Sequence, residues 1–175
     1  ALRFNDLHDY VERTFRHVAE SKAVDFKIDM DPELPMNMFT DAQRLEQVIR
    51  NLLSNAFKFT EKGQVTMSVA QVTEGWNPDN EVLNHARSVI AFSVSDTGIG
   101  IAPEKQQIIF EAFQQADGST SRKYGGTGLG LSISRELAAL LGGEIRLNSH
   151  LGQGSTFTLY LPLYYIEPAP EKARA

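Results

Sequence analysis

The chain has 175 residues, of which 42% are hydrophobic and 22% charged, and its net charge is −5. These values are typical of one globular domain, and the acidic balance argues against a nucleic-acid partner held through its phosphates. The absence of cysteine excludes disulfides, thiolate catalysis and cysteine-type zinc sites. No apolar run of about 18 residues and no basic-then-apolar leader is present. We therefore expect that this segment neither contacts a membrane nor is exported.

The first third of the chain predicts a helix and then a strand. Apolar residues recur every three or four positions and predict an amphipathic helix over residues 5–22. Residues 25–31 (DFKIDMD) alternate with period two and predict a short strand, which a turn at Pro32 and Pro35 ends. The apolar positions of the helix are Leu7, Val11, Phe15 and Val18.

A second, stronger helix is predicted to follow. Thr40 or Asp41 is a suitable N-cap, and Lys62-Gly63 is expected to end the helix. Its apolar residues form one continuous stripe of Leu45, Val48, Ile49, Leu52, Leu53 and Ala56.

The middle of the chain predicts two strands, at 65–69 and 89–94, joined by a polar hairpin loop over residues 73–88. Trp76 in this loop is interpreted as a local packing residue. A glycine-rich turn (DTGIGIAP) follows the second strand, and then a short helix through Phe110 and Phe113. Residues 114–128 contain almost no large apolar side chain and predict a loop.

The last part predicts a helix from Leu129 to Leu141, closed by Gly142-Gly143, and strands near 144–148 and 155–161. Together the elements predict an α/β fold, more closely an α+β two-layer sandwich with a mixed sheet and helices on one face. The domain is expected to span residues 1–163, followed by a linker at 164–175. The pattern leaves the strand order open.

Three polar residues of the second helix share one face. Asn51, Asn55 and Lys58 stand at i, i+4 and i+7, beside the apolar stripe. Asparagine is a mediocre helix former, so this pattern indicates the wall of a polar pocket. An amide oxygen can complete the shell of a hard cation, and a lysine can meet a phosphate. The alternative is a solvated helix face with incidental amides.

Two glycine-rich segments follow. Asp96 ends a strand and begins DTGIG, where a carboxylate can accept a hydrogen bond from an exocyclic amino group such as that of adenine; an ordinary turn is the alternative. Residues 125–130 (GGTGLG) lead into a helix and suit an anion-binding helix N-terminus. Arg122 and Lys123 lie just before it, where they reach a terminal phosphate or form a solvated basic pair. The segment is neither a Walker loop nor a dinucleotide fingerprint.

In this order, the three features are interpreted as separate walls of one nucleotide pocket. They also resemble the catalytic ATP-binding domain of bacterial sensor histidine kinases, within the gyrase–chaperone–kinase ATPase superfamily. QVIRNLLSNAFKFT resembles the N box of that family and VSDTGIGIAP its G1 box. IIFEAF resembles the F box, GGTGLGLSI the G2 box and GQGSTFTLYLP the closing segment. The similarity runs from about residue 3 to residue 163.

The resemblance implies a Bergerat-type sandwich that holds ATP and Mg²⁺ under a lid spanning about 102–124. It implies that Asn55 is the Mg²⁺ ligand, that Asp96 holds the adenine amino group, and that Phe110 and Phe113 anchor the lid, although their spacing also suits core packing. Asn51, Lys58 and Arg122 are implied to be catalytic. The implied ATP-binding set is Asn51, Asn55, Lys58, Phe59, Asp96, Gly98, Gly100, Lys123, Tyr124, Gly126, Thr127, Gly128, Leu129, Gly130 and Thr156.

The residue one turn before Asn55 indicates the reaction type. In the gyrase and chaperone branch a glutamate there activates water, whereas this chain has Asn51, which cannot act as a general base. Glu46 lies too far back along the helix to replace it. The pattern favours phosphoryl transfer to a protein over hydrolysis. An ATPase coupled to conformational change and a nucleotide-sensing module remain the alternatives.

The phosphorylated histidine of this family lies in a separate helical hairpin. His8, His17, His85 and His150 all lack its sequence context, and His8 and His17 are interpreted as surface residues of a helix. The resemblance therefore implies two partners, a histidine-bearing dimerisation domain of the same kinase and a response regulator or receiver domain, in a two-component phosphorelay. The sequence RKYGGTGLGL, common in hybrid kinases, favours a downstream receiver. The implied location is cytoplasmic, including the cytoplasmic part of a membrane-anchored sensor.

Overall fold

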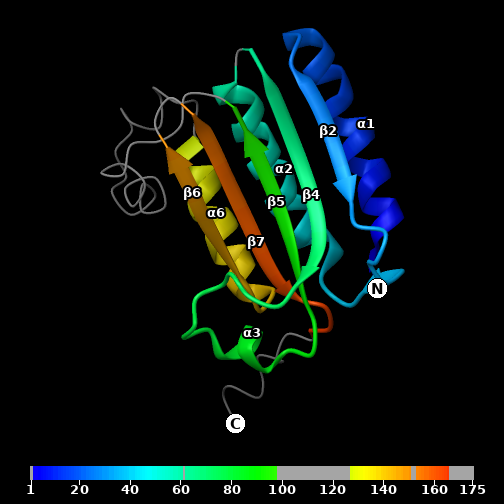
Figure 1. Ribbon diagram of the computed structural model, residues 1–175, viewed down its shortest axis with the longest axis vertical. Helices are drawn as coiled ribbons and strands as arrows, with labels where there is room; N and C mark the ends of the chain where they lie inside the picture. The colour runs from blue at the N-terminus through cyan, green and yellow to red at the C-terminus, as the bar shows by residue number, and fades with distance from the viewer. Residues whose placement is uncertain (1, 61, 98–126, 151–152, 166–175) are drawn as a thin grey trace.

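The computed structural model describes residues 2–60, 62–97, 127–150 and 153–165, with the side chains of all but Phe59, 127–132 and His150. A five-stranded sheet in the order β2-β4-β5-β7-β6 forms one layer. Three long helices, α1, α2 and α6, form the second layer on one face of this sheet (Figure 1). The strands are β2 (Asp25–Met30), β4 (Gln64–Val72), β5 (Val89–Asp96), β6 (Glu144–His150) and β7 (Gly154–Pro162). The predicted two-layer α/β fold is confirmed.

The sheet is mixed because one connection crosses over. β2 and β4 are parallel, whereas every other neighbouring pair is antiparallel. A parallel pair needs a crossover, and α2 supplies it. The open face of the sheet carries polar rows in which Ser93 meets Thr158 and Ser95 meets Thr156.

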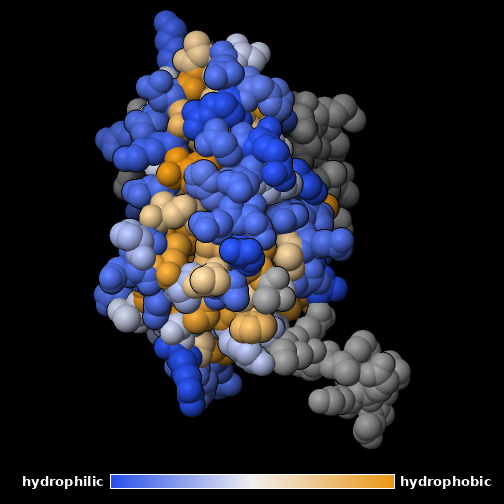
Figure 2. Space-filling view, turned by 90° about the vertical axis from the view of Figure 1, so that its right-hand side faces the viewer, coloured by the Kyte–Doolittle hydropathy of each residue, from blue (hydrophilic) through white to orange (hydrophobic). Residues whose placement is uncertain are grey.

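The first two long helices bury the faces that their sequence patterns predict. α1 (Phe4–Lys22) buries Leu7, Val11 and Phe15 and leaves a hydrophilic outer surface (Figure 2). α2 (Ala42–Phe59) is capped by Asp41, whose carboxylate accepts the Arg44 N–H over 3.2 Å. Its whole predicted stripe is buried. In the third helix, α6 (Thr127–Leu140), two residues of the apolar pattern, Ile133 and Leu140, are instead 39% and 43% exposed, and Ala138 is buried.

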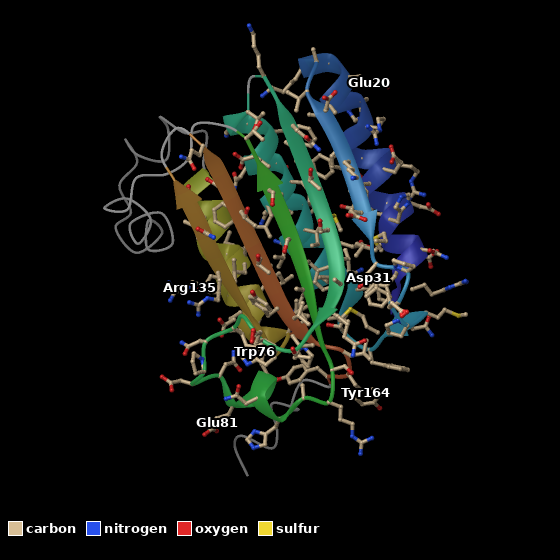
Figure 3. All side chains as sticks on the ribbon, in the orientation of Figure 1. Glu20, Asp31, Trp76, Glu81, Arg135 and Tyr164 are labelled. Carbon is tan, nitrogen blue, oxygen red and sulfur yellow. The ribbon has the colours of Figure 1, made fainter. Side chains whose placement is uncertain are left out.

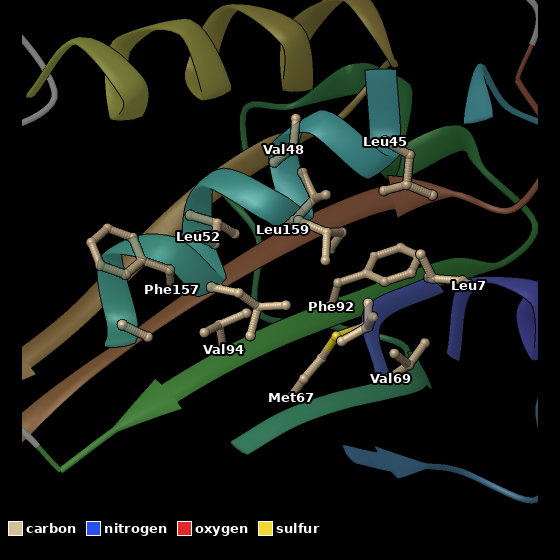
Figure 4. Packing of buried hydrophobic residues seen from close by; sticks show 14 of the residues in the cluster. Leu7, Leu45, Val48, Leu52, Met67, Val69, Phe92, Val94, Phe157 and Leu159 are labelled. Carbon is tan, nitrogen blue, oxygen red and sulfur yellow. The ribbon is translucent and has the colours of Figure 1, made fainter. Parts of the chain in front are cut away.

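The core lies between α2 and the central strands (Figure 4). Leu52 of α2, Met67 of β4 and Phe92 of β5 are completely buried in it. Phe92 also packs against Phe4, with ring centroids 6.5 Å apart. In β4, β5 and β7 every second side chain points into the core, as expected for strands of a sheet that helices cover on one face only.

Two small elements differ from the sequence prediction. A ribbon of β1 (Leu2–Arg3) and β3 (Asn37–Met38) was not predicted, because two residues are too few to show a period. The predicted hairpin loop at 73–88 contains a short helix, α3 (Glu81–His85). Asn80 caps this helix through the Leu83 N–H, and burial of the Leu83 side chain holds it in place.

Trp76 has the local packing role that the sequence indicates. Its ring packs edge-on against Tyr160 at 6.0 Å, and its indole N–H donates to Asn84 over 2.8 Å. The carboxylate of Glu144 accepts bonds from Asn77 and Asn80, which ties the segment to β6. Burial raises the pKa of Tyr160. These contacts lie at the lower end of the molecule (Figure 3).

Backbone contacts continue past the expected domain boundary at residue 163. The Phe39 N–H donates to the Leu163 carbonyl, and the Tyr165 N–H donates to the Phe39 carbonyl, both over 2.9 Å. His17 is exposed and His8 half-buried, both on α1. None of the helices described is long and apolar enough to cross a membrane.

We predict that Phe92→Ala destabilises the fold by about 3–5 kcal/mol, because it removes a buried ring at the centre of the core. Equilibrium urea unfolding measures this free energy. Val82→Ala is the matched control, because Val82 is 44% exposed on α3 and should change stability little. A loss no larger for Phe92→Ala than for Val82→Ala would contradict the described packing.

Candidate functional site

Three structural elements that are distant in sequence meet at one end of the domain. α2 and β5 end there and α6 begins there, at the top of Figure 1. Trp76 and Tyr164 mark the opposite end (Figure 3). We call the first end the site end. It brings together the described parts of the three predicted pocket walls.

The polar face of α2 runs from the interior to the solvent at the site end. Asn51 is half-buried, Asn55 is 8% exposed, and Lys58 is exposed on the last turn. The Asn55 Nδ2 atom has no hydrogen-bond partner among the residues that the structure describes. A buried amide left unpaired costs free energy, so this group is suited to pairing with a ligand or water.

Asn51 is fixed by a residue that the sequence prediction missed. Its Nδ2 donates to the Ser134 hydroxyl on α6 over 3.1 Å, and Ser134 is completely buried. The bond joins α2 to α6 directly at the site. The apolar pattern of the sequence did not point to Ser134, because it favoured the helix face of Ile133 and Leu140, which is exposed.

Asp96 lies at the end of β5 within a row of polar residues. It pairs in register with Ser155 on β7, and Ser155 pairs with Ser149 on β6. All three are largely buried, and the two serine hydroxyls are 2.8 Å apart. Strand alternation puts this row on the core side of the sheet, in line with Val94 and Phe157. The site end therefore presents a carboxylate beside two hydroxyls.

Thr156, expected near the adenine, lies on the other face of the sheet. Its hydroxyl is 3.0 Å from that of Ser95 on the open face, whereas Asp96 belongs to the core face. Thr156 and Asp96 therefore lie on opposite faces of the sheet. Ser155 is the β7 hydroxyl that lies beside Asp96.

Gly154 allows the close approach of β7 to Asp96. Its φ is +113°, a conformation that side chains disfavour. A Cβ atom at this position would collide with the Asp96 carbonyl oxygen and lie 3.0 Å from Thr97 Cα. The absence of a side chain at Gly154 therefore helps to fix Asp96.

The predicted glycine-rich anion site coincides with the start of α6. The helix begins at Thr127, two residues before the predicted start at Leu129, so Thr127, Gly128, Leu129 and Gly130 form its first turn. The first N–H groups of a helix have no acceptor within it. These backbone donors and the helix dipole make this turn suitable for a phosphate.

Several predicted residues lie outside the described part of the chain. They are Gly98, Gly100, Phe110, Phe113, Arg122, Lys123, Tyr124 and Gly126, and the Phe59 side chain.

The donors at this end fit a magnesium ion that arrives with a phosphate ligand. Among the described residues there is no cluster of three His, Asp or Glu side chains that could hold a metal alone. Mg²⁺ is often held by one or two protein ligands plus substrate phosphates. The Oδ1 atom of Asn55 would be one such neutral ligand, and its unpaired Nδ2 atom could donate to a phosphate oxygen.

Glu46 cannot replace the missing general base. It is half-buried in the first half of α2, and nine residues of continuous helix separate it from Asn55. That spacing is about 13 Å along the axis and about half a turn around it.

Comparison with known proteins agrees with this arrangement. Residues 40–165 match the family described as "Histidine kinase-, DNA gyrase B-, and HSP90-like ATPase". The chain belongs to this family. The resemblance to histidine kinase catalytic domains and their fold is confirmed.

Relatives in sequence and structure are histidine kinases. The chain is 39% identical to autoinducer 2 sensor kinase/phosphatase LuxQ of Vibrio parahaemolyticus, over 91% of this chain and 18% of LuxQ. It is 42% identical to hybrid signal transduction histidine kinase A of Dictyostelium discoideum, over 87% of this chain and 7% of that protein. Full-length ShkA, solved with AMPPNP, matches with a TM-score of 0.72 and 31% identity, over 95% of this chain and 31% of ShkA. The chain thus spans a small part of each.

We predict that Gly154→Ala destabilises the fold by about 1–3 kcal/mol, because it forces a side chain into a strained conformation against Asp96. Urea unfolding measures the loss. Gln153→Ala, at the exposed neighbouring position, is the control and should be close to neutral. Equal stability of the two variants would show that β7 does not approach Asp96 as described.

Proposed function

We propose that this chain binds ATP with Mg²⁺ and donates the γ-phosphate to a histidine of a separate acceptor domain. The observation that carries this proposal is the buried Asn55 side chain, whose Nδ2 atom has no partner among the described residues, at the same end as the buried Asp96 carboxylate. Membership of the histidine kinase, gyrase and chaperone ATPase family supports ATP as the nucleotide. AMPPNP, an ATP analogue, is bound in the similar ShkA structure.

The adenine end of the site is assigned to β5 and β7. Asp96 accepts a hydrogen bond from the exocyclic amino group of adenine. Ser155, in register beside Asp96, supplies a hydroxyl that can donate or accept. We also assign Gly98, Gly100 and Phe59 to the adenine end of the site.

The phosphate end of the site is assigned to α2 and the first turn of α6. Asn55 offers its Oδ1 atom to Mg²⁺, which when bound neutralises phosphate charge. Lys58 contributes a cation, and the N–H groups of residues 127–130 contribute backbone donors. Asn51, oriented by Ser134, faces the reacting phosphate. Arg122, Lys123, Tyr124 and Gly126 are proposed as further contacts.

Catalysis then depends on positioning and charge neutralisation. The bond between the γ-phosphorus and ADP breaks while a bond forms from phosphorus to an imidazole nitrogen of the acceptor. Asn51 does not take a proton from water, which disfavours hydrolysis. The proposed partners are the dimerisation domain of the same kinase and a response regulator or receiver domain, as the hybrid relative suggests. Use of ATP favours a cytoplasmic site of action.

We predict that Asn55→Ala lowers phosphorylation of a supplied acceptor domain by about 100-fold or more, because it removes the proposed Mg²⁺ ligand. The assay follows transfer of labelled γ-phosphate to the dimerisation domain of a relative. Asn148→Ala, an exposed amide on the open face of β6, is the control and should retain full activity.

Three outcomes of this assay would contradict the proposal. Full transfer by Asn55→Ala would remove Asn55 from the site. Rapid ATP hydrolysis without transfer to any acceptor would favour a gyrase-type ATPase. ATP binding without transfer or hydrolysis would favour a nucleotide-sensing module.

A second prediction separates the two faces of β7. Ser155→Ala should weaken ATP binding by about fivefold, as loss of one hydrogen bond does. Thr156→Ala should bind like the unsubstituted chain, because its hydroxyl meets Ser95 on the open face. Isothermal titration calorimetry measures both, and the reverse order of effects would contradict the assignment of Ser155.

A further inference from the structure

A side chain from α1 holds the C-terminal end of α2. The last carbonyls of a helix have no donor within the helix. α1 ends with Ala23 in the left-handed conformation, and the Ala23 N–H caps that helix. α2 instead continues into Thr60 with extended backbone, and the Lys22 ammonium donates a hydrogen bond to the Phe57 carbonyl. A cation at this position also suits the helix dipole.

The side chain of Phe57 is fixed as firmly as its carbonyl. The ring is 2% exposed and stacks on Phe15 at 5.8 Å between centroids. Phe26 meets the same ring edge-on at 5.2 Å. Main chain and side chain at Phe57 are therefore both held, which fixes the rotation of the last turn of α2 about its axis.

This turn carries two residues of the proposed phosphate site. Asn55 precedes Phe57 by two residues and Lys58 follows it directly. Successive helical residues are about 100° apart, so Asn55 lies on nearly the opposite side of α2 from the Phe57 ring. The contacts of Phe57 thus fix the direction in which the Asn55 side chain points, and they leave that side of the helix open.

We propose that Lys22 is a positioning residue for the phosphate end of the site. Its ammonium holds the last turn of α2 so that Asn55 and Lys58 meet Mg²⁺ and the phosphates in one geometry. The inference rests on the proposed function and adds to it a residue from a different helix, outside every motif identified in the sequence. Lys22 acts through α2 and contacts no ligand itself.

The experiment compares Lys22→Met, which keeps the aliphatic stem but removes the donor, with Lys22→Arg, which keeps a cationic donor. Lys27→Met is the control, because Lys27 is exposed on β2. Each folded variant is titrated with ATP by calorimetry, once with saturating Mg²⁺ and once with a chelator. The melting temperature of each ligand-free variant is also measured.

We expect Lys22→Met to raise the Kd for ATP with Mg²⁺ about tenfold, as loss of support behind a metal ligand typically does. The Kd measured with the chelator should change much less. Lys22→Arg should restore both values. Lys27→Met should match the unsubstituted chain.

The positioning role is overturned if Lys22→Met lowers the melting temperature but weakens both titrations equally, or leaves both unchanged. It is also overturned if folded Lys22→Arg behaves like Lys22→Met. Should Lys22→Met fail to fold, Lys22→Gln replaces it in the same comparison. If the unsubstituted chain binds no ATP with Mg²⁺, the proposed function fails and this inference fails with it, an outcome distinct from the others.

Discussion

Burial of the apolar stripe of α2 against the sheet is the interaction on which the rest of the structure depends. Leu45, Val48, Ile49, Leu52 and Leu53 are all completely buried, and a close-packed core leaves such a helix one orientation. Because Asn51 and Asn55 border this stripe, the same burial decides where two polar groups lie. Hydrophobic packing thus offsets the free-energy cost of burying the unpaired Nδ2 atom of Asn55.

The sequence predicts those features that depend on local periodicity or on local turn residues. The three long helices and the five sheet strands were located correctly, because each buries one face along a sufficiently long segment. The Asn51 and Asn55 spacing correctly predicted a polar face beside the core. Trp76 was correctly interpreted as packing. α3 was missed because a single turn shows no period, and its stability comes from the Asn80 cap and the buried Leu83.

Contacts between segments far apart in the chain could not be predicted from local sequence patterns. The strand order and the bond from Asn51 to Ser134 depend on tertiary packing. The position of Ser155 beside Asp96, by contrast, follows from strand alternation. Counting back by two from the buried Phe157 and Leu159 reaches Ser155, not Thr156, on the core face of β7. Lys22 had no such signal, because its partner is a backbone carbonyl on another helix.

The central claim is that α2, β5, β7 and α6 bind one nucleotide together. Nuclear magnetic resonance can test it directly by following backbone amides of Asn55, Asp96, Ser155 and Thr127 while ATP with Mg²⁺ is added. The account predicts that all four signals shift along one shared binding curve. Shifts confined to one element, or signals that saturate at different ATP concentrations, would contradict it.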